Sequence, residues 1–84
     1  MVLFLAPGSG EWAVVVTRRV GGAVDRNRAK RILREAWRQV SPQVTRDFDT
    51  VLVAREAIRG ATTQDLVSEM IELLPREAVR DVRA

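Results

Sequence analysis

The apolar residues of this chain alternate between strand-like and helix-like spacing. Residues 2–5 form a short apolar run that ends at the turn formers Pro7-Gly8-Ser9-Gly10, which predicts a strand followed by a turn. Residues 11–19 form a longer run in which Trp12, Val14 and Val16 alternate with Ala13, Val15 and Thr17, so both faces are largely apolar. Two strands joined by a four-residue turn predict a hairpin. Residues 48–55, with a β-branched centre, predict a third strand.

Two helices are predicted from apolar stripes with helical spacing. The first follows Gly21-Gly22, takes Asp25 as its N-cap and ends at Ser41-Pro42. Its stripe is Ala29, Ile32, Leu33, Ala36, Trp37 and Val40. The second begins at Thr62 or Thr63, carries Asp65 in its first turn and ends at Pro75. Its stripe is Leu66, Val67, Met70, Ile71 and Leu74.

The order of these elements is strand-strand-helix-strand-helix, which predicts an α/β (α+β) two-layer sandwich. At 84 residues the chain is long enough for one small domain, spanning residues 1–84. Residues 76–84 are predicted to be a frayed tail or a short extra turn.

Positive charge is concentrated in one part of the chain. Residues 18–38 hold 8 of the 14 cationic residues and only two acidic ones, Asp25 and Glu35, so this stretch carries a net charge of +6. The whole chain carries only +3, so the remainder is mildly acidic. Such a distribution is typical of a protein that presents one face to a polyanion.

The cations of the first helix recur at helical spacing. Arg26, Lys30, Arg34 and Arg38 are four residues apart and form one row, while Arg28 and Arg31 lie on the other flank of the polar surface. All but one of the chain's cations are arginines, whose planar fork matches the oxygens of a phosphate. The free amides of the first turn would also favour an anion. A solvated basic helix in an arginine-rich sequence is the competing interpretation.

Composition and spacing argue against a catalytic centre. The sequence contains no Cys and no His, which removes disulfides, zinc fingers, thiol chemistry and imidazole catalysis. The carboxylate pairs Asp47/Asp49 and Glu69/Glu72 are interpreted as solvated charge. Residues 1–6 are too short for a signal peptide or a membrane span, so we expect a cytoplasmic protein that needs no membrane.

The residues from Arg18 to Glu35 carry a family resemblance. The run RRVGGAV followed by RNRAKRILRE closely resembles the signature of the bacterial ribonuclease P protein component, and the similarity extends over nearly the whole chain. The resemblance implies an RNA-binding domain with a left-handed βαβ crossover, an exception to the usual right-handed rule.

The resemblance also implies a function. It implies the protein subunit of ribonuclease P, an endoribonuclease whose catalytic RNA removes the 5′ leader from precursor tRNA. The chemistry would belong to that RNA and its Mg²⁺ ions, so no cofactor or metal is expected on the protein, and no protein partner is required. The implied RNA contacts are Arg18, Arg19, Arg26, Asn27, Arg28, Lys30, Arg31 and Arg34.

The family's second surface is a cleft on the sheet that holds the single-stranded leader. Trp12, Val14 and Val16, or the opposite face of the same strand, are candidates for part of it. Family members normally open with a basic segment, a helix that carries aromatics and an additional strand. This chain starts almost inside the fold, so we expect an internal start or a short or trimmed form, with leader binding more affected than RNA binding.

Two other functions are alternatives, the first of which fits the same charge pattern. A general structured-RNA-binding or ribosome-associated module would show little preference for the catalytic RNA. A protein-binding domain that uses an uncovered sheet would associate in a manner insensitive to salt. Trp37 is predicted to pack in the core, and Trp12 either packs or stacks on a base.

Overall fold

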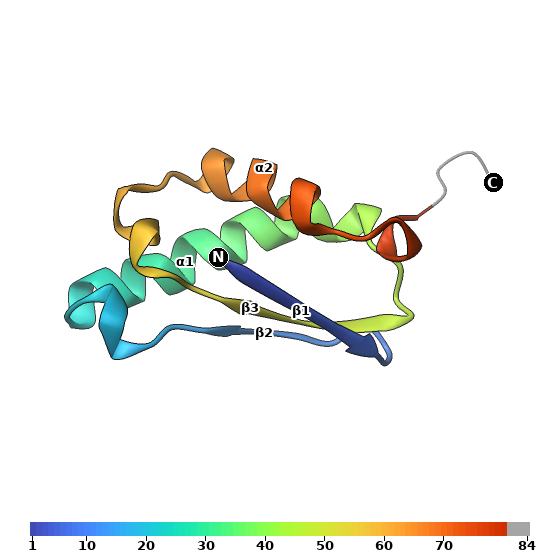
Figure 1. Ribbon diagram of the computed structural model, residues 1–84, viewed down its shortest axis with the longest axis horizontal. Coiled ribbons are helices and arrows are strands. Elements are labelled where there is room, and N and C mark those ends of the chain that lie inside the picture. Colours follow the sequence, from blue (N-terminus) through green and yellow to red (C-terminus); the bar gives the residue numbers. More distant parts are fainter. Residues whose placement is uncertain (81–84) are drawn as a thin grey trace.

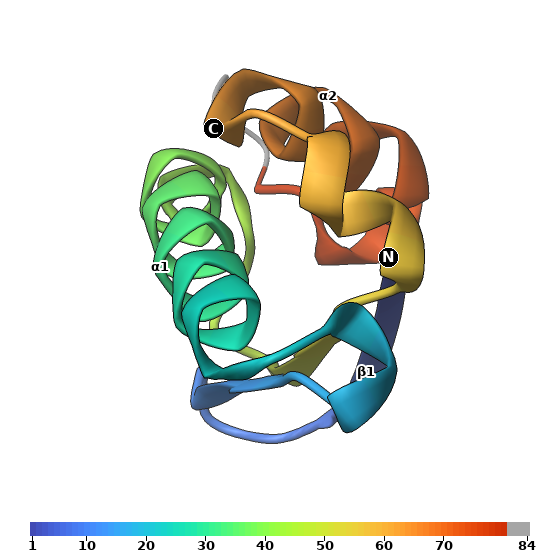
Figure 2. The same ribbon diagram turned by 90° about the vertical axis from the view of Figure 1, so that its left-hand side faces the viewer.

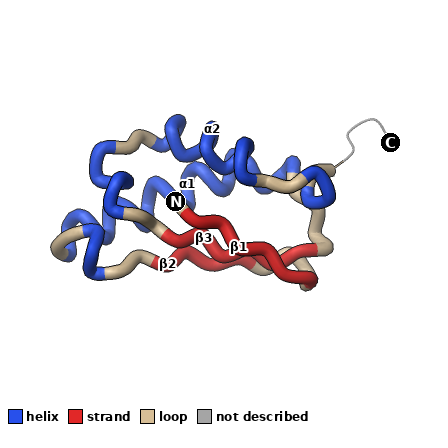
Figure 3. The backbone as a smooth tube through the Cα atoms, viewed as in Figure 1, coloured by secondary structure: helices blue, strands red, loops and turns tan. Residues whose placement is uncertain are grey.

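A three-stranded sheet forms one layer of the fold and two helices form the other. The computed structural model describes residues 1–80, and Figure 1 shows the helices lying over one face of the sheet. The strands are β1 (Val2–Pro7), β2 (Trp12–Val15) and β3 (Phe48–Val53), and the helices are α1 (Ala23–Val40) and α2 (Thr63–Leu73). Figure 3 separates the two layers by colour. The predicted two-layer sandwich, with its order of strands and helices, is confirmed.

The strand order is β1-β3-β2, so the predicted hairpin between the first two strands is wrong. β3 lies between them, antiparallel to β1 and parallel to β2. It is the strand best suited to the centre because Thr50 and Leu52 are buried under the helices while Val51 faces the other side. The turn after β1 therefore carries the chain past the end of β3, and the Asp49 carboxylate accepts hydrogen bonds from the amides of Ser9 and Glu11 at 3.0 and 2.9 Å.

The connection from β2 through α1 to β3 is the crossover of a βαβ unit. In Figure 2 both of these strands point toward the viewer, β2 lies to the left of β3, and α1 lies above the sheet. This arrangement is left-handed, as the family resemblance implies, and it is rare among parallel connections.

The core stripe of α1 is as predicted, but the start of the helix is not. All six residues of the stripe are buried. The N-cap is Gly22 rather than Asp25, which lies in the first turn and forms an ion pair with Arg59 at 3.8 Å. The helix starts early because Gly21 turns the chain with φ 140°, a conformation that disfavours other residues, and an added Cβ there would collide with Asp25.

The second helix follows its prediction more closely. Thr62 is the N-cap, and its side chain accepts from the Asp65 amide while the Asp65 carboxylate accepts from the Thr62 amide. This reciprocal pair is a capping box, and it explains why the helix begins at this point. Leu66 and Met70 are buried as predicted, whereas Ile71 is half exposed. Ile71 follows Met70 directly, so only one of these neighbours can face α1.

β1 runs on to Pro7, beyond the predicted residues 2–5, whereas β2 and β3 are shorter than predicted at their C-terminal ends. β2 stops at Val15, the last residue opposite β3, and Arg18–Val20 form a 3₁₀ turn that buries Val20. β3 likewise ends at Val53 rather than at residue 55. At the other end of the chain, Arg76–Ala78 form the predicted short extra turn, with Ala78 buried. The rest of that prediction, over residues 81–84, lies outside the described residues.

The side of the sheet away from the helices is apolar and open. Leu3, Leu5 and Val14 pack against the core below the helices. Their neighbours in the sequence, among them Phe4 and Val15, point the other way and are exposed. No helix of residues 1–80 covers this open face.

Candidate nucleic-acid interface

The surface of α1 that points away from the core carries most of its exposed charge. Asn27, Arg31, Arg34 and Arg38 are all exposed and share this side of the helix, and we refer to these four residues as the outer stripe. The predicted row with four-residue spacing is not straight because a turn holds only about 3.6 residues. Arg26 and Lys30 therefore sit on a half-buried flank, and the row reaches the outside only at Arg34 and Arg38.

The arginines of the outer stripe are largely free to bind a ligand. Within residues 1–80, the only ion pair it makes is between Arg31 and Glu35, whose N–O distance is 4.0 Å and whose side chains are both exposed. Such a pair contributes little and is readily exchanged for a phosphate. Arg38 belongs to this stripe, although the family signature does not point to it.

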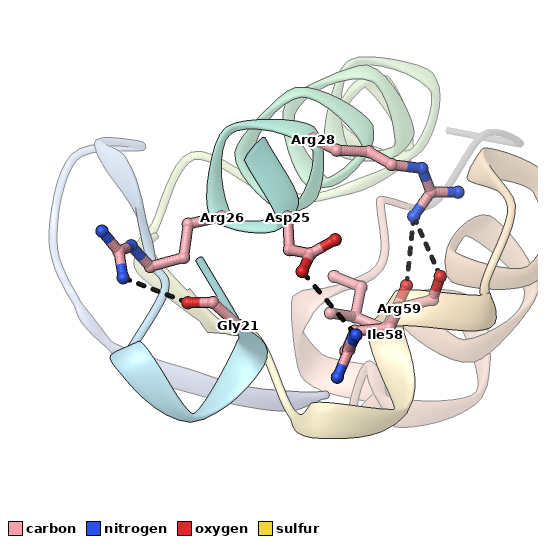
Figure 4. A network of polar contacts seen from close by, with 6 residues as sticks. All are labelled: Gly21, Asp25, Arg26, Arg28, Ile58 and Arg59. Carbon is pink, nitrogen blue, oxygen red and sulfur yellow. Dashed lines mark hydrogen bonds and ion pairs between the residues drawn. The ribbon is translucent and has the colours of Figure 1, made fainter. Parts of the chain in front are cut away.

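Arg28 has a different environment from the arginines of the outer stripe. Its guanidinium donates to the carbonyl oxygens of Ile58 and Arg59 at 3.3 and 3.5 Å (Figure 4). It also donates to the carbonyl oxygen of Ala61 at 2.6 Å. These carbonyls belong to the 3₁₀ turn Glu56–Gly60 and the residue after it. Arg28 therefore ties α1 to the segment that leads into α2, a contact that the sequence spacing could not reveal.

Arg26 also uses part of its hydrogen-bonding capacity within the protein. Its guanidinium donates to the carbonyl oxygen of Gly21 at 3.1 Å, which holds the side chain beside the start of α1 (Figure 4). Arg18 and Arg19 lie nearby and are exposed, but in the 3₁₀ turn rather than at a strand end. The structure thus brings the predicted cations together around the first half of α1.

The first turn of α1 leaves its backbone amides free for an anion, and the carboxylate that it carries, Asp25, is paired with Arg59. Its N-cap is a glycine, and within residues 1–80 no side chain accepts a hydrogen bond from its first amides. Free amides and the helix dipole favour negative charge at such an end. Val24, on the same turn, is 83% exposed, which is unusual for an aliphatic side chain and leaves the turn accessible.

The candidate leader-cleft residues Trp12, Val14 and Val16 lie on the helix side of the sheet rather than on its open face. Val14 and Val16 are half-buried against the core, while Trp12 is 39% exposed beside α1. The opposite face of β2, with Ala13 and Val15, belongs to the open face of the sheet. A hollow of about 690 Å³ lies on that side, lined by Val2, Phe4, Arg19, Val53 and Arg55 among others.

Asp49 has a role that the sequence did not reveal. The hydrogen bonds it accepts from the amides of Ser9 and Glu11 lower the pKa of its carboxyl. Gly8 lies against this carboxylate so closely that a Cβ at Gly8 would collide with it. Asp49 is therefore a fixed part of the turn rather than solvated charge. The only sign of this turn in the sequence is the group of turn formers that Asp49 contacts.

Other kinds of site find no support in the described chain. Residues 1–80 contain no cluster of three or more carboxylates that could hold a metal ion. None of the helices in that part of the chain is long and apolar enough to cross a membrane.

The protein is a small α+β sandwich with arginines along one helix. These features place it in the class of polyanion-binding domains. The family model described as Ribonuclease P matches residues 1–78. The chain therefore belongs to the ribonuclease P protein family.

Relatives of known name agree with the family match. The ribonuclease P protein component of Chloroflexus aurantiacus is 47% identical over 66 residues, which cover 76% of this chain and 47% of that protein. The ribonuclease P protein component of Shouchella clausii is 32% identical over 82 residues, covering 93% of this chain and 67% of that protein. The chain thus spans about half to two thirds of the length of these relatives.

Solved structures share the fold. The RNase P protein of Thermotoga maritima superposes with a TM-score of 0.73 at 23% identity, over 88% of this chain and 74% of that one. A mutant RNase P protein of Staphylococcus aureus gives a TM-score of 0.71 at 22% identity, over 93% of this chain and 69% of that one.

Proposed function

We propose that this chain is an RNA-binding subunit of ribonuclease P that assists a catalytic RNA in removing the 5′ leader from precursor tRNA. The observation that carries the proposal is the outer stripe of α1, three exposed arginines and an asparagine next to an uncapped helix start. Family membership supports the RNA partner, since relatives are named ribonuclease P protein components.

The proposed RNA contacts follow the geometry of α1. Arg31, Arg34 and Arg38 would bind phosphates from the outside of the helix, with Asn27 at its start. Four further cations border this surface and add positive charge beside it: Arg18, Arg19, Arg26 and Lys30. Arg28 contributes through its position in the fold, with part of its guanidinium left to face RNA.

The precursor's leader would lie on the open face of the sheet. This face offers an exposed Phe4 for stacking, and the hollow beside it carries Arg19 and Arg55 at its rim. The chain supplies charge and shape there, while the catalytic RNA and its Mg²⁺ ions would supply the hydrolytic chemistry. In this role the protein screens phosphate repulsion between two RNAs, which lowers the Mg²⁺ requirement. Such a subunit would act in the cytoplasm, where tRNA precursors are made.

The direct test is cleavage of a leader-bearing precursor tRNA by a bacterial ribonuclease P RNA at low Mg²⁺, with and without the chain. Restored cleavage is the expected result, and the triple variant Arg31→Ala/Arg34→Ala/Arg38→Ala should restore much less. Tight, selective binding to the catalytic RNA without rescue would contradict the leader role alone. Binding without preference for that RNA would indicate a general RNA-binding module and contradict the proposal.

A further inference from the structure

We propose that a hollow between the carboxyl-terminal half of α1 and the start of β2 binds one unpaired nucleotide of RNA. The proposal rests on the proposed function, in that the chain must bind RNA. It concerns a different place from the outer stripe and from the open face of the sheet, since the hollow lies on the helix side.

The hollow is large enough for a nucleotide. Its volume is about 530 Å³, within the range of about 300–1,000 Å³ typical of small-molecule sites. Two tryptophans, Trp12 and Trp37, line one part of it, and Arg46 and Arg80 line another. Ser41 and Thr45 also line it, and the Thr45 hydroxyl is hydrogen-bonded to Asp47.

The two tryptophans form a supported aromatic wall. Their ring centroids lie 6.4 Å apart with an interplanar angle of 45°, an arrangement that aromatic pairs favour. Trp37 is only 4% exposed and fixed in the core, whereas Trp12 is 39% exposed. Trp12 is thus held against Trp37 while part of its surface remains available for a base to stack.

The two arginines place positive charge beside this wall. Among residues 1–80, neither Arg46 nor Arg80 forms an ion pair with a carboxylate. Arg46 is also positioned by the turn after β1. Gly10 adopts φ 92°, and a Cβ at this position would lie 3.3 Å from the Cβ of Arg46, so the turn packs against the stem of this arginine.

A flat aromatic surface and a pair of cations match two parts of a nucleotide. The base stacks on Trp12, and the phosphate meets the guanidinium groups. Stacking is tolerant of sequence because every base has a π-face. A paired base in a helix could not enter, so the site selects an unpaired nucleotide.

The test follows the indole N–H signals of the protein in solution during titration with hexauridylate, a short single-stranded RNA. The sequence has two tryptophans, so the spectrum has two indole signals, and Trp12→Phe assigns them. The expected result is a saturable shift of the Trp12 signal. Arg46→Ala should weaken the affinity about fivefold at about 0.1 M salt, as for one lost phosphate contact. Trp12→Ala should weaken it about tenfold.

Arg76→Ala is the matched control because it removes an exposed arginine that does not line the hollow. It should leave the affinity for hexauridylate within about twofold. Arg46→Ala should keep the fold because this side chain is exposed, so its effect reports on binding alone. Trp12→Ala, in contrast, removes a contact with Trp37.

Two outcomes would overturn the proposal. One is a Trp12 signal that does not shift during the titration with hexauridylate, although the chain binds ribonuclease P RNA. The proposed function would then still stand. The other is an equal loss of affinity in Arg46→Ala and Arg76→Ala, which would place the RNA elsewhere. A chain that binds neither RNA would contradict the proposed function as well.

Discussion

The two helices begin in opposite ways, and the difference separates a structural helix end from a binding one. α2 closes its first turn with Thr62 and Asp65, which satisfy each other's backbone amides. α1 begins at Gly22 with no side-chain cap among the described residues, and arginines surround it. The carboxylate at the start of α2 favours stability, whereas the free amides and cations at the start of α1 favour an anion.

A second contrast lies within α1 itself. Arg28 bonds three backbone carbonyls and so belongs to the fold, while Arg31, Arg34 and Arg38 point to solvent. Arginines a few residues apart on one helix are therefore predicted to differ in what they do. The charge pattern alone predicts the same role for each of these arginines.

The largest effect is expected from removing the outer stripe. Arg31→Ala/Arg34→Ala/Arg38→Ala should weaken binding to ribonuclease P RNA about a hundredfold at about 0.1 M salt, because about three phosphate contacts are lost. Filter binding or fluorescence anisotropy measures the affinity. The same triple change to Lys keeps the charge but loses the fork, and should cost only a few-fold. An alanine variant that binds as tightly as the original chain would remove α1 from the interface.

Arg28→Ala should act on the fold instead. Loss of its hydrogen bonds to the Ile58, Arg59 and Ala61 carbonyls should lower the free energy of unfolding by about 2 kcal/mol, as measured by urea denaturation. Arg31→Ala is the control and should change it by less than about 0.5 kcal/mol. Equal stability of the two variants would show that the contacts of Arg28 do not hold α1 to the 3₁₀ turn.

The capped end of α2 should matter for stability and not for RNA. Thr62→Ala removes the acceptor for the Asp65 amide and should cost about 1 kcal/mol of unfolding free energy. RNA affinity should stay within about twofold of the original. A large loss of affinity in this variant would mean that the interface extends to α2.

The carboxylates that hold backbone amides make stability depend on pH. Hydrogen bonds from Thr62 lower the pKa of Asp65, and those from Ser9 and Glu11 lower the pKa of Asp49. Because the folded pKa lies below the ordinary value of 3.8, the stabilisation is fully present above that value and is lost as the pH falls through the folded pKa. Asp65→Asn should therefore be less stable than the original chain at pH 6, with the gap closing in acid. A gap that persists in acid would contradict this cause.

The smallest effect comes from giving α1 the kind of cap that α2 has. Gly22 has an extended backbone and open space where a Cβ would lie, so Gly22→Asp should fit and add about 0.3 kcal/mol of stability. Its carboxylate would compete with phosphate, so RNA affinity should fall about threefold. Gly22→Ser caps without charge and should keep the affinity. Equal affinity of the two variants would show that no anion binds at this helix end.

The sequence predicted the elements that depend on local periodicity. The stripe of α1 has the spacing of a buried helix face, and all six of its residues are buried. The family signature pointed to the cations of α1, and the resemblance implied that the crossover is left-handed. Trp37 packs in the core as predicted.

What the sequence missed depends on contacts between distant residues. The turn after β1 is held by Asp49, a residue about 40 positions away along the chain. Arg28 reads as one more cation of a basic helix, and only the fold brings the carbonyls near Ile58 to it. Asp25 resembles an N-cap, but the conformation of Gly21 moved the helix start ahead of it.

The most direct measurement of the central claim is the salt dependence of binding to ribonuclease P RNA, for the original chain and for the triple alanine variant of Arg31, Arg34 and Arg38. If about five cations on and around α1 contact phosphates, log affinity should fall with log salt at a slope of about −3.5 to −4.5. The triple variant should give a slope shallower by about 2 to 3. Equal slopes for the two proteins would contradict the claim that the outer stripe binds RNA.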